Sequence, residues 1–258
     1  MALKLSVLFF SPLLAGLLIY FLPEGRSRNY RLLLVFAGSY LFGITVVHIL
    51  PELYRSSAEV ELIGLFVLAG FFLQQLLEYF TSGIEHGHLP ATHLGDQGHD
   101  HAHHHSHYHQ QVSALVLLLA LCVHAFLEGA MLAQPVTMGF GYDVNAILLG
   151  IALHRAPAAF ALMTVLTIQL RSKSKALPYL VVFSTAAPVG LLISTYLSEM
   201  EALTASGLTF LYALVSGNFL HISTTIVFES SPEHHFNARK LAVAVVGALA
   251  AVAVEYIL

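Results

Sequence analysis

Long runs of apolar residues are the feature that most constrains how this chain can fold. An α-helix needs about 20 predominantly apolar residues to cross the hydrocarbon core of a bilayer. Eight runs of that length occupy roughly 3–22, 31–50, 61–80, 112–133, 143–170, 177–198, 206–228 and 239–258. Helices are favoured there because they satisfy their own backbone polar groups in lipid. The sequence therefore predicts an all-α, polytopic integral membrane protein with eight transmembrane helices in a single domain, residues 1–258.

Composition and charge agree with a membrane protein and exclude other classes. Hydrophobic residues make up 57% of the chain and charged residues 10%, whereas soluble domains carry about 25% charged residues. The formal net charge is −4, so nothing indicates a nucleic-acid partner. Cys122 is the single cysteine. Disulfides and thiolate metal centres within one chain are therefore excluded.

Lys and Arg residues are concentrated on one side of the predicted membrane. The loops after the first, fifth and seventh helices hold Arg26, Arg28, Arg31, Arg171, Lys173, Lys175, Arg239 and Lys240. The opposite side holds Lys4 and Arg55 beside several acidic residues. Because short basic loops stay in the cytoplasm, both chain termini are predicted to face outward. We expect a plasma membrane or a bacterial inner membrane.

The loop between the third and fourth predicted helices, residues 81–111, differs from the others. It contains ten histidines and no Lys or Arg, and its low complexity predicts disorder on the cytoplasmic side. Imidazole is a good ligand for zinc, copper and nickel. We therefore favour metal capture over a plain polar linker, with the candidate ligands His99, His101, His103, His104, His105, His107 and His109.

Three ionisable residues lie near the middle of the fourth and fifth predicted helices. His124 and Glu128 are four residues apart and share one helix face. His154 falls at the same depth on the next helix, and Pro157 frees a backbone carbonyl beside it. Such groups are costly in a membrane and usually line a cavity or pathway. Two imidazoles and one carboxylate predict a site for a divalent transition metal.

Further polar residues are spread along the predicted membrane normal. His48 and Glu52 form another four-residue pair near the outer end of the second helix. His221 lies in the inner half of the seventh helix, and Glu229 near the inner surface. These four are candidates for the entrance or exit of an ion path. The alternatives are that these residues simply lie at the water interface, or that they form hydrogen bonds between helices.

A short internal echo indicates repeated architecture. Residues 37–41 read AGSYL in the second helix, and residues 216–220 read SGNFL in the seventh. The two helices run in opposite directions, and inverted repeats are common in transporters. We therefore predict an inverted repeat that relates helices one to three with helices six to eight.

Several motifs together resemble a known family. They are HILPE (48–52), the His-rich loop, HAFLEG (124–129), HRAP (154–157) and APVG (187–190). In this order, on eight helices, they resemble the ZIP (Zrt/Irt-like) family of divalent-metal transporters across essentially the whole chain. The resemblance implies movement of Zn²⁺, or of Fe²⁺, Mn²⁺ or Cd²⁺, into the cytoplasm by an elevator-like or rocking motion of a helix bundle. It implies no cofactor, since the ion is cargo.

The resemblance also assigns site residues and partners. By motif, His124, Glu128 and His154 fall on metal ligands of the family. The expected partners are a divalent ion and the lipid bilayer, with a homodimer as an open question and no nucleic acid.

Three positions depart from the family pattern. Ala125 replaces an Asn, Arg155 replaces a frequent acid, and Ala158 replaces a frequent ligand. A buried guanidinium needs a partner, so we predict that Arg155 pairs with Glu128 or with an acid of the metal site and substitutes electrostatically for a second metal. Two alternatives to transport stay open. One is a transport-incompetent metal sensor or scaffold, and the less favoured one is an intramembrane zinc hydrolase. The chain is not expected to be an enzyme.

Overall fold

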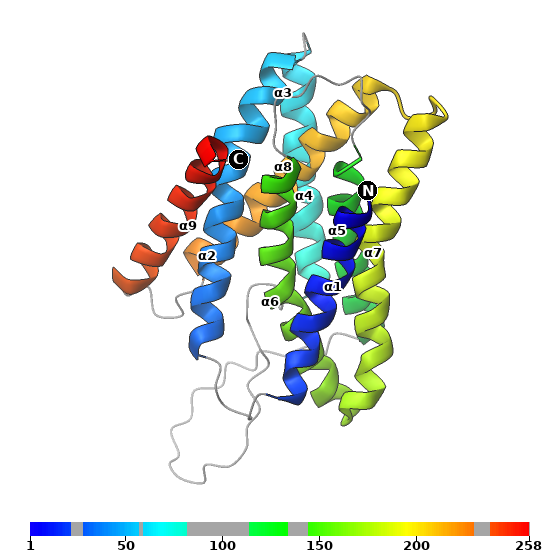
Figure 1. The fold of residues 1–258 in the computed structure, drawn as a ribbon, viewed down its shortest axis with the longest axis vertical. Helices are drawn as coiled ribbons and strands as arrows, with labels where there is room; N and C mark the ends of the chain where they lie inside the picture. Colours follow the sequence, from blue (N-terminus) through cyan, green and yellow to red (C-terminus); the bar gives the residue numbers. More distant parts are fainter. Residues whose placement is uncertain (22–27, 57–58, 82–113, 134–143, 230–237, 258) are drawn as a thin grey trace, which may run out of the picture.

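The computed structural model describes residues 1–21, 28–56, 59–81, 114–133, 144–229 and 238–257. Within these ranges every regular element is a helix (Figure 1). The α-helices are α1 (Ala2–Leu17), α2 (Arg28–Ile44), α3 (Leu50–Ser56), α4 (Val60–Thr81), α5 (Ala114–Met131), α6 (Val144–Leu170), α7 (Lys173–Glu199), α8 (Ala205–Glu229) and α9 (Ala238–Ile257).

The helices confirm the all-α, polytopic class. Seven helical stretches in the described ranges are long and apolar enough to cross a membrane: Ala2–Tyr20, Leu32–Arg55, Val60–Phe80, Ala114–Met131, Val144–Leu170, Lys173–Glu199 and Ala205–Val227. They coincide with the first seven predicted spans. Helix α9 lies where the eighth span was predicted. Apart from Thr81, the His-rich loop lies outside the described residues.

The second predicted span is longer and less regular than its sequence pattern indicated. A π-helical turn, η2 (Thr45–Ile49), separates α2 from α3. Pro51 accounts for it, because its ring would clash with the carbonyl one turn earlier and it donates no backbone hydrogen bond. The buried Thr45 hydroxyl donates to the Leu41 carbonyl at 2.7 Å. Such π-turns often accompany functional sites, and this one holds His48.

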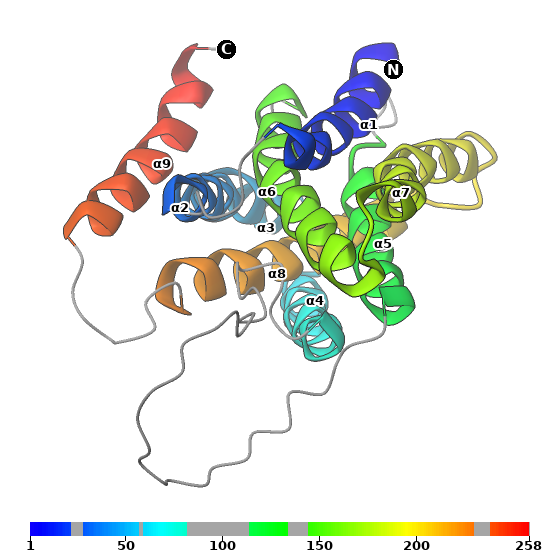
Figure 2. The ribbon, with the colours of Figure 1, turned by 90° about the horizontal axis from the view of Figure 1, so that it is seen from below.

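Helix pairings follow the predicted inverted repeat. The most extensive ones are α4 with α8, α2 with α9, α5 with α7 and α1 with α6 (Figure 2). If α1, α2–α3 and α4 correspond to α7, α8 and α9, the α4–α8 pair corresponds to α9–α2. The α1–α6 pair then corresponds to α7–α5. Each of these four pairings therefore has a counterpart in the other half.

Helix α6 lies at the centre of the bundle (Figure 2). In its most apolar stretch 72% of the residues are buried, against 17% in α1. A residue on α6 is thus surrounded by protein where the same residue on α1 would meet lipid. This position allows His154 and Arg155 to be polar.

Two glycines bring α5 and α7 into direct backbone contact. A Cβ atom on Gly129 would collide with the carbonyl oxygen of Ala187, and one on Gly190 would collide with that of Phe126. Small residues permit such close approach between membrane helices. The crossing holds Glu128, which precedes Gly129, deep inside the protein.

Candidate metal site

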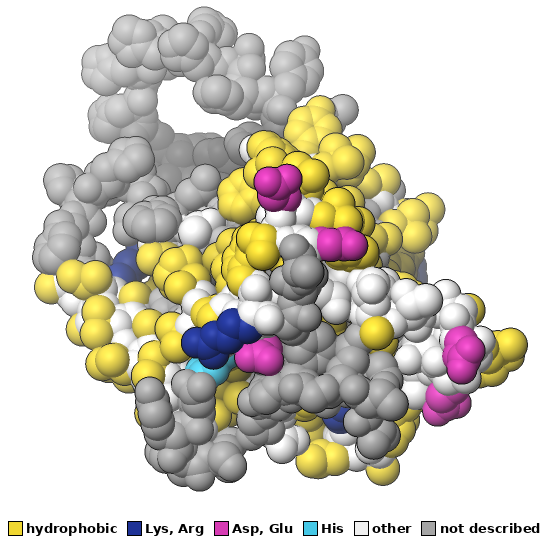
Figure 3. Space-filling model, turned by 90° about the horizontal axis from the view of Figure 1, so that it is seen from above, with side chains coloured by type: hydrophobic (Ala, Val, Ile, Leu, Met, Phe, Trp, Pro, Cys, Tyr) yellow, Lys and Arg dark blue, Asp and Glu magenta, His cyan; other side chains and the backbone are white. Residues whose placement is uncertain are grey.

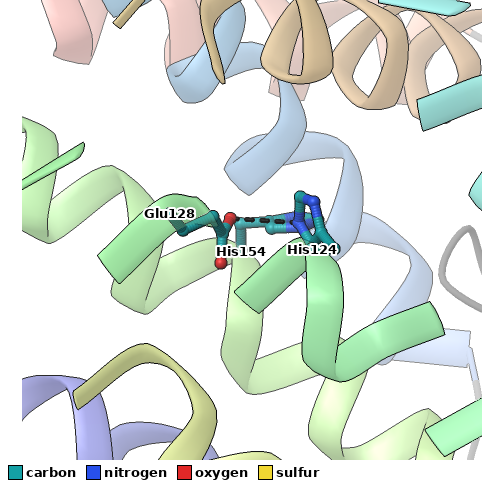
Figure 4. Close-up of side chains that lie close together, drawn as sticks. All are labelled: His124, Glu128 and His154. Carbon is teal, nitrogen blue, oxygen red and sulfur yellow. Dashed lines mark ion pairs between the residues drawn. The ribbon is translucent and has the colours of Figure 1, made fainter. Parts of the chain in front are cut away.

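Helix α5 places His124 and Glu128 on one face, one turn apart. The His124 Nε2 atom lies 3.1 Å from Glu128 Oε1 (Figure 4). The side chains meet because residues four apart are neighbours on a helix surface. His124 is 3% exposed and Glu128 0%, so water does not screen this pair.

Helix α6 supplies the third group. The His154 ring lies beside that of His124, with centroids 5.8 Å apart and planes at 89°. One ligand atom from each of His124, Glu128 and His154 falls within 4.8 Å of the others, and all three residues are buried. Figure 4 shows the three side chains converging from the two helices. In the described part of the chain, no other group of three His, Cys, Asp or Glu residues comes this close.

The spacing fits a divalent transition metal. Zinc binds His nitrogen and carboxylate oxygen at about 2.0–2.2 Å, so two of its ligands lie about 3.0–3.5 Å apart. The His124–Glu128 separation of 3.1 Å already meets this condition, and His154 needs a small movement to join. Three protein ligands leave a coordination position open, as in sites that exchange a water or substrate.

Arg155 is the fourth buried group of this region. Its Nε lies 3.9 Å from Glu128 Oε2, and its Nη2 donates a 3.0 Å hydrogen bond to the Phe183 carbonyl on α7. The guanidinium carbon also stands 4.9 Å from the centre of the Phe183 ring. At 1% exposure, the cation is stabilised by a carboxylate, a carbonyl dipole and an aromatic face.

The two alanines that depart from the family pattern are also buried. Ala125 is 0% exposed and Ala158 5%. Their methyl groups offer no ligand atom, so neither position can add a ligand to His124, Glu128 and His154. With neutral imidazoles, the Glu128 and Arg155 charges cancel before an ion binds.

The other predicted path residues are not members of the three-residue cluster. His48 lies in η2 and Glu52 in α3, both partly buried. His221 on α8 is buried, and its Nδ1 lies 3.4 Å from Glu78 Oε2 on α4. The side chain of Glu229 and histidines 99–109 lie outside the described residues.

Two contacts of the buried polar groups were not predicted from the sequence. The pairing of His221 with Glu78 depends on the packing of α4 against α8, which a single sequence does not give. The Phe183 carbonyl has no sequence signal, because any residue supplies one.

Comparison with known proteins gives these residues a family context. The ZIP zinc transporter family matches residues 85–255, which include all three site residues. Zinc transporter ZIP9 of Macaca fascicularis is 34% identical over 116 residues, covering 42% of this chain and 48% of that protein. Zinc transporter ZIP9 of Xenopus tropicalis is 34% identical over 122 residues, covering 45% and 39%. The match spans less than half of each relative's length.

The family match covers well over half of the chain. It coincides with a helical membrane fold whose buried polar cluster lies on the predicted motifs. The chain belongs to the ZIP zinc transporter family.

Proposed function

We propose that this protein carries divalent transition-metal cations, Zn²⁺ foremost, across a membrane toward the cytoplasm through the His124–Glu128–His154 site. The observation that carries the proposal is this cluster of two imidazoles and one carboxylate, buried at the centre of a membrane bundle. Intramembrane ionisable groups are costly and mark ion pathways. Membership of the ZIP family and likeness to the zinc transporter ZIP9 support the same ion.

The donor set favours an ion that both enters and leaves. Imidazole and carboxylate suit zinc and neighbouring first-row metals, including Fe²⁺ and Mn²⁺, and Cd²⁺ competes for such sites. Three protein ligands bind less tightly than the four of a structural zinc site. The open position lets a water or an incoming ligand displace the protein ligands one at a time.

Arg155 limits the central site to one ion in this proposal. Its guanidinium lies 3.9 Å from Glu128, in the space where a second cation would otherwise balance that carboxylate. A fixed positive charge repels a second divalent ion and keeps the empty site neutral. Arg155 thus substitutes electrostatically for a second metal.

The helix pairings support a motion of one helix group against another. Helices α1, α5, α6 and α7 pair mainly among themselves, and so do α2, α4, α8 and α9. The central site lies wholly on the first group, so moving that group carries the site with it. His48 and Glu52 then lie on the way in, and His221 and Glu229 on the way out.

The proposed direction rests on the distribution of charge. Figure 3 shows acidic side chains over the end of the molecule where α3 meets α4 and α7 meets α8. Glu59, Glu61, Glu199 and Glu201 are exposed there. Lys and Arg flank the opposite ends of α6, α7 and α9, which the positive-inside rule assigns to the cytoplasm. Both termini then face outward, and the His-rich segment 99–109 captures metal on the inner side.

Zinc uptake into proteoliposomes tests the proposal. We expect uptake by the wild-type protein, with Fe²⁺, Mn²⁺ or Cd²⁺ as competitors. His124→Ala should lose at least about tenfold of the rate, because one of three ligands is gone. Val123→Ala, at an exposed position of the same helix, is the matched control. Equal uptake by His124→Ala and wild type would refute a path through α5.

A second candidate function is a metal sensor or scaffold that does not transport. Ala125 and Ala158 favour it, because they remove ligands found in the family, and Arg155 occupies one face of Glu128. A sensor would bind Zn²⁺ in the purified state without uptake into proteoliposomes. Hydrolysis of a lipid or peptide without ion flux would instead indicate an intramembrane zinc enzyme.

A further inference from the structure

A second polar cluster lies between α4 and α8, two helices that do not carry the central site. His221 Nδ1 lies 3.4 Å from Glu78 Oε2. His221 is 5% exposed, and the Glu78 side chain is 18% exposed. The central site uses α5 and α6 and involves neither residue. A His–Glu pair thus joins two helices that also approach each other closely at Gly70 and Gly217.

Two neighbouring residues add side-chain amides to the faces of α4 and α8 that carry Glu78 and His221. Gln74 precedes Glu78 by one turn on α4, and Asn218 precedes His221 by one turn on α8. Both are 0% exposed. Within the described residues, neither amide atom of Asn218 has a hydrogen-bond partner. Because buried polar atoms are nearly always satisfied, this amide indicates a ligand or water near α8.

The geometry of the pair suits a bound cation. Two ligands of a tetrahedral zinc ion lie about 3.4 Å apart when the bonds are about 2.1 Å long, which equals the Nδ1–Oε2 separation of 3.4 Å. The Phe71 ring packs edge-on against His221, with centroids 4.8 Å apart and planes at 69°, and this orients the imidazole. Glu78 lies in the last turn of α4, where the helix dipole favours positive charge.

A purely structural role explains these groups less well. In a membrane, apolar side chains would hold two helices together without the cost of burying ionisable groups. Gly70 and Gly217 already allow α4 and α8 to approach closely, since a Cβ on either would collide with a carbonyl of the facing helix. Packing alone therefore does not require a histidine facing a glutamate.

We propose that His221 and Glu78, with an amide oxygen of Asn218 or Gln74 and with water, form a second and weaker divalent-cation site between α4 and α8. The inference rests on the proposed function in one respect, that the ion is the one carried by the central site. With fewer charged or imidazole ligands, the second site releases its ion more readily. It receives the ion from the His124–Glu128–His154 site and passes it on.

Cobalt binding to the purified full-length protein tests the proposal. Co²⁺ replaces Zn²⁺ and gives a visible spectrum at each site. Every variant carries Ser in place of histidines 99, 101, 103, 104, 105, 107 and 109, so that this segment does not contribute. We expect two bound ions of different affinity in this background. Glu78→Gln and His221→Gln should each lower the affinity for the second ion by at least about tenfold and leave the affinity for the first ion unchanged.

Control variants separate this proposal from the central site. His124→Ala should lower the affinity for the first ion and leave binding of the second ion unchanged. Gln75→Ala, at an exposed position beside Gln74, should bind both ions as the background protein does. Binding of the first ion by Glu78→Gln and His221→Gln shows that these two variants are folded. One bound ion in the background, or two unchanged ions in Glu78→Gln and His221→Gln, would overturn the second site. If His124→Ala binds the first ion as tightly as the background protein does, the central site is wrong and the second site is unaffected.

Discussion

At the scale of single residues, the buried charges decide what the central site can hold. Glu128 meets His124 through one oxygen at 3.1 Å and Arg155 through the other at 3.9 Å. The carboxylate is thus shared between the His124 imidazole and a permanent cation. In the proposed site, an incoming ion would gain the attraction of Glu128 and meet the repulsion of Arg155, and the balance of the two would set its affinity.

Removing the Arg155 charge should tighten metal binding. Two unit charges 4 Å apart interact by about 4 kcal/mol at an effective dielectric constant near 20. Arg155→Ala should therefore raise the Zn²⁺ affinity of the central site by at least about tenfold and slow release. Arg155→Lys, which keeps the charge, should stay closer to wild type. Zn²⁺ competition against a chelator measures both, and weaker binding by Arg155→Ala would contradict an electrostatic role.

At the scale of helices, the sequence predicted what the bilayer dictates and missed what depends on helix crossings. The spans follow from apolar length, and His124, Glu128 and His154 stood out because ionisable residues are rare in such runs. The contact of His221 with Glu78 depends on how α4 crosses α8, which no single helix encodes. The Arg155–Phe183 hydrogen bond uses a backbone carbonyl, so it leaves no mark in the sequence. The π-turn before Pro51 has a sequence signal, the proline itself, but the length of the apolar run does not show where the helix becomes irregular.

The α5–α7 crossing should be sensitive to one methyl group. Gly129→Ala places a Cβ against the Ala187 carbonyl, so α5 must move away and take Glu128 with it. Overpacking of this kind costs about 1–3 kcal/mol, and we expect a lower melting temperature together with weaker Zn²⁺ binding. Gly64→Ala is the matched control, since its Cβ would meet only the Tyr54 hydroxyl at 3.8 Å. A melting temperature of Gly129→Ala equal to that of the wild type would show that α5 and α7 can accommodate the extra methyl group.

At the scale of the whole molecule, the most extensive contact between the two helix groups is that of α2 with α6, and α4 with α5 is the next. Tyr40 on α2 is 1% exposed, and its hydroxyl donates a 3.2 Å hydrogen bond to the Ala146 carbonyl on α6. Gly150 on α6 makes room for the ring, since a Cβ there would lie 3.1 Å from it. This contact joins the group that carries the central site to the group that does not. Any sliding of one group past the other must break it.

Tyr40→Phe removes that hydrogen bond while keeping the ring. A buried hydrogen bond contributes about 1 kcal/mol, which corresponds to about a fivefold change in an equilibrium constant. Zinc uptake into proteoliposomes should change by up to that factor, whereas the Zn²⁺ affinity of the purified protein should not, because the hydrogen bond that is removed goes to the Ala146 carbonyl and not to one of the three site residues. Ser223→Ala is the control. It removes a buried hydroxyl that bonds only within α8, at 2.6 Å from the Phe219 carbonyl, and it should leave uptake unchanged. Equal uptake rates in Tyr40→Phe and wild type would show that α2 and α6 move together, and the boundary between the moving groups would then have to lie elsewhere in the bundle.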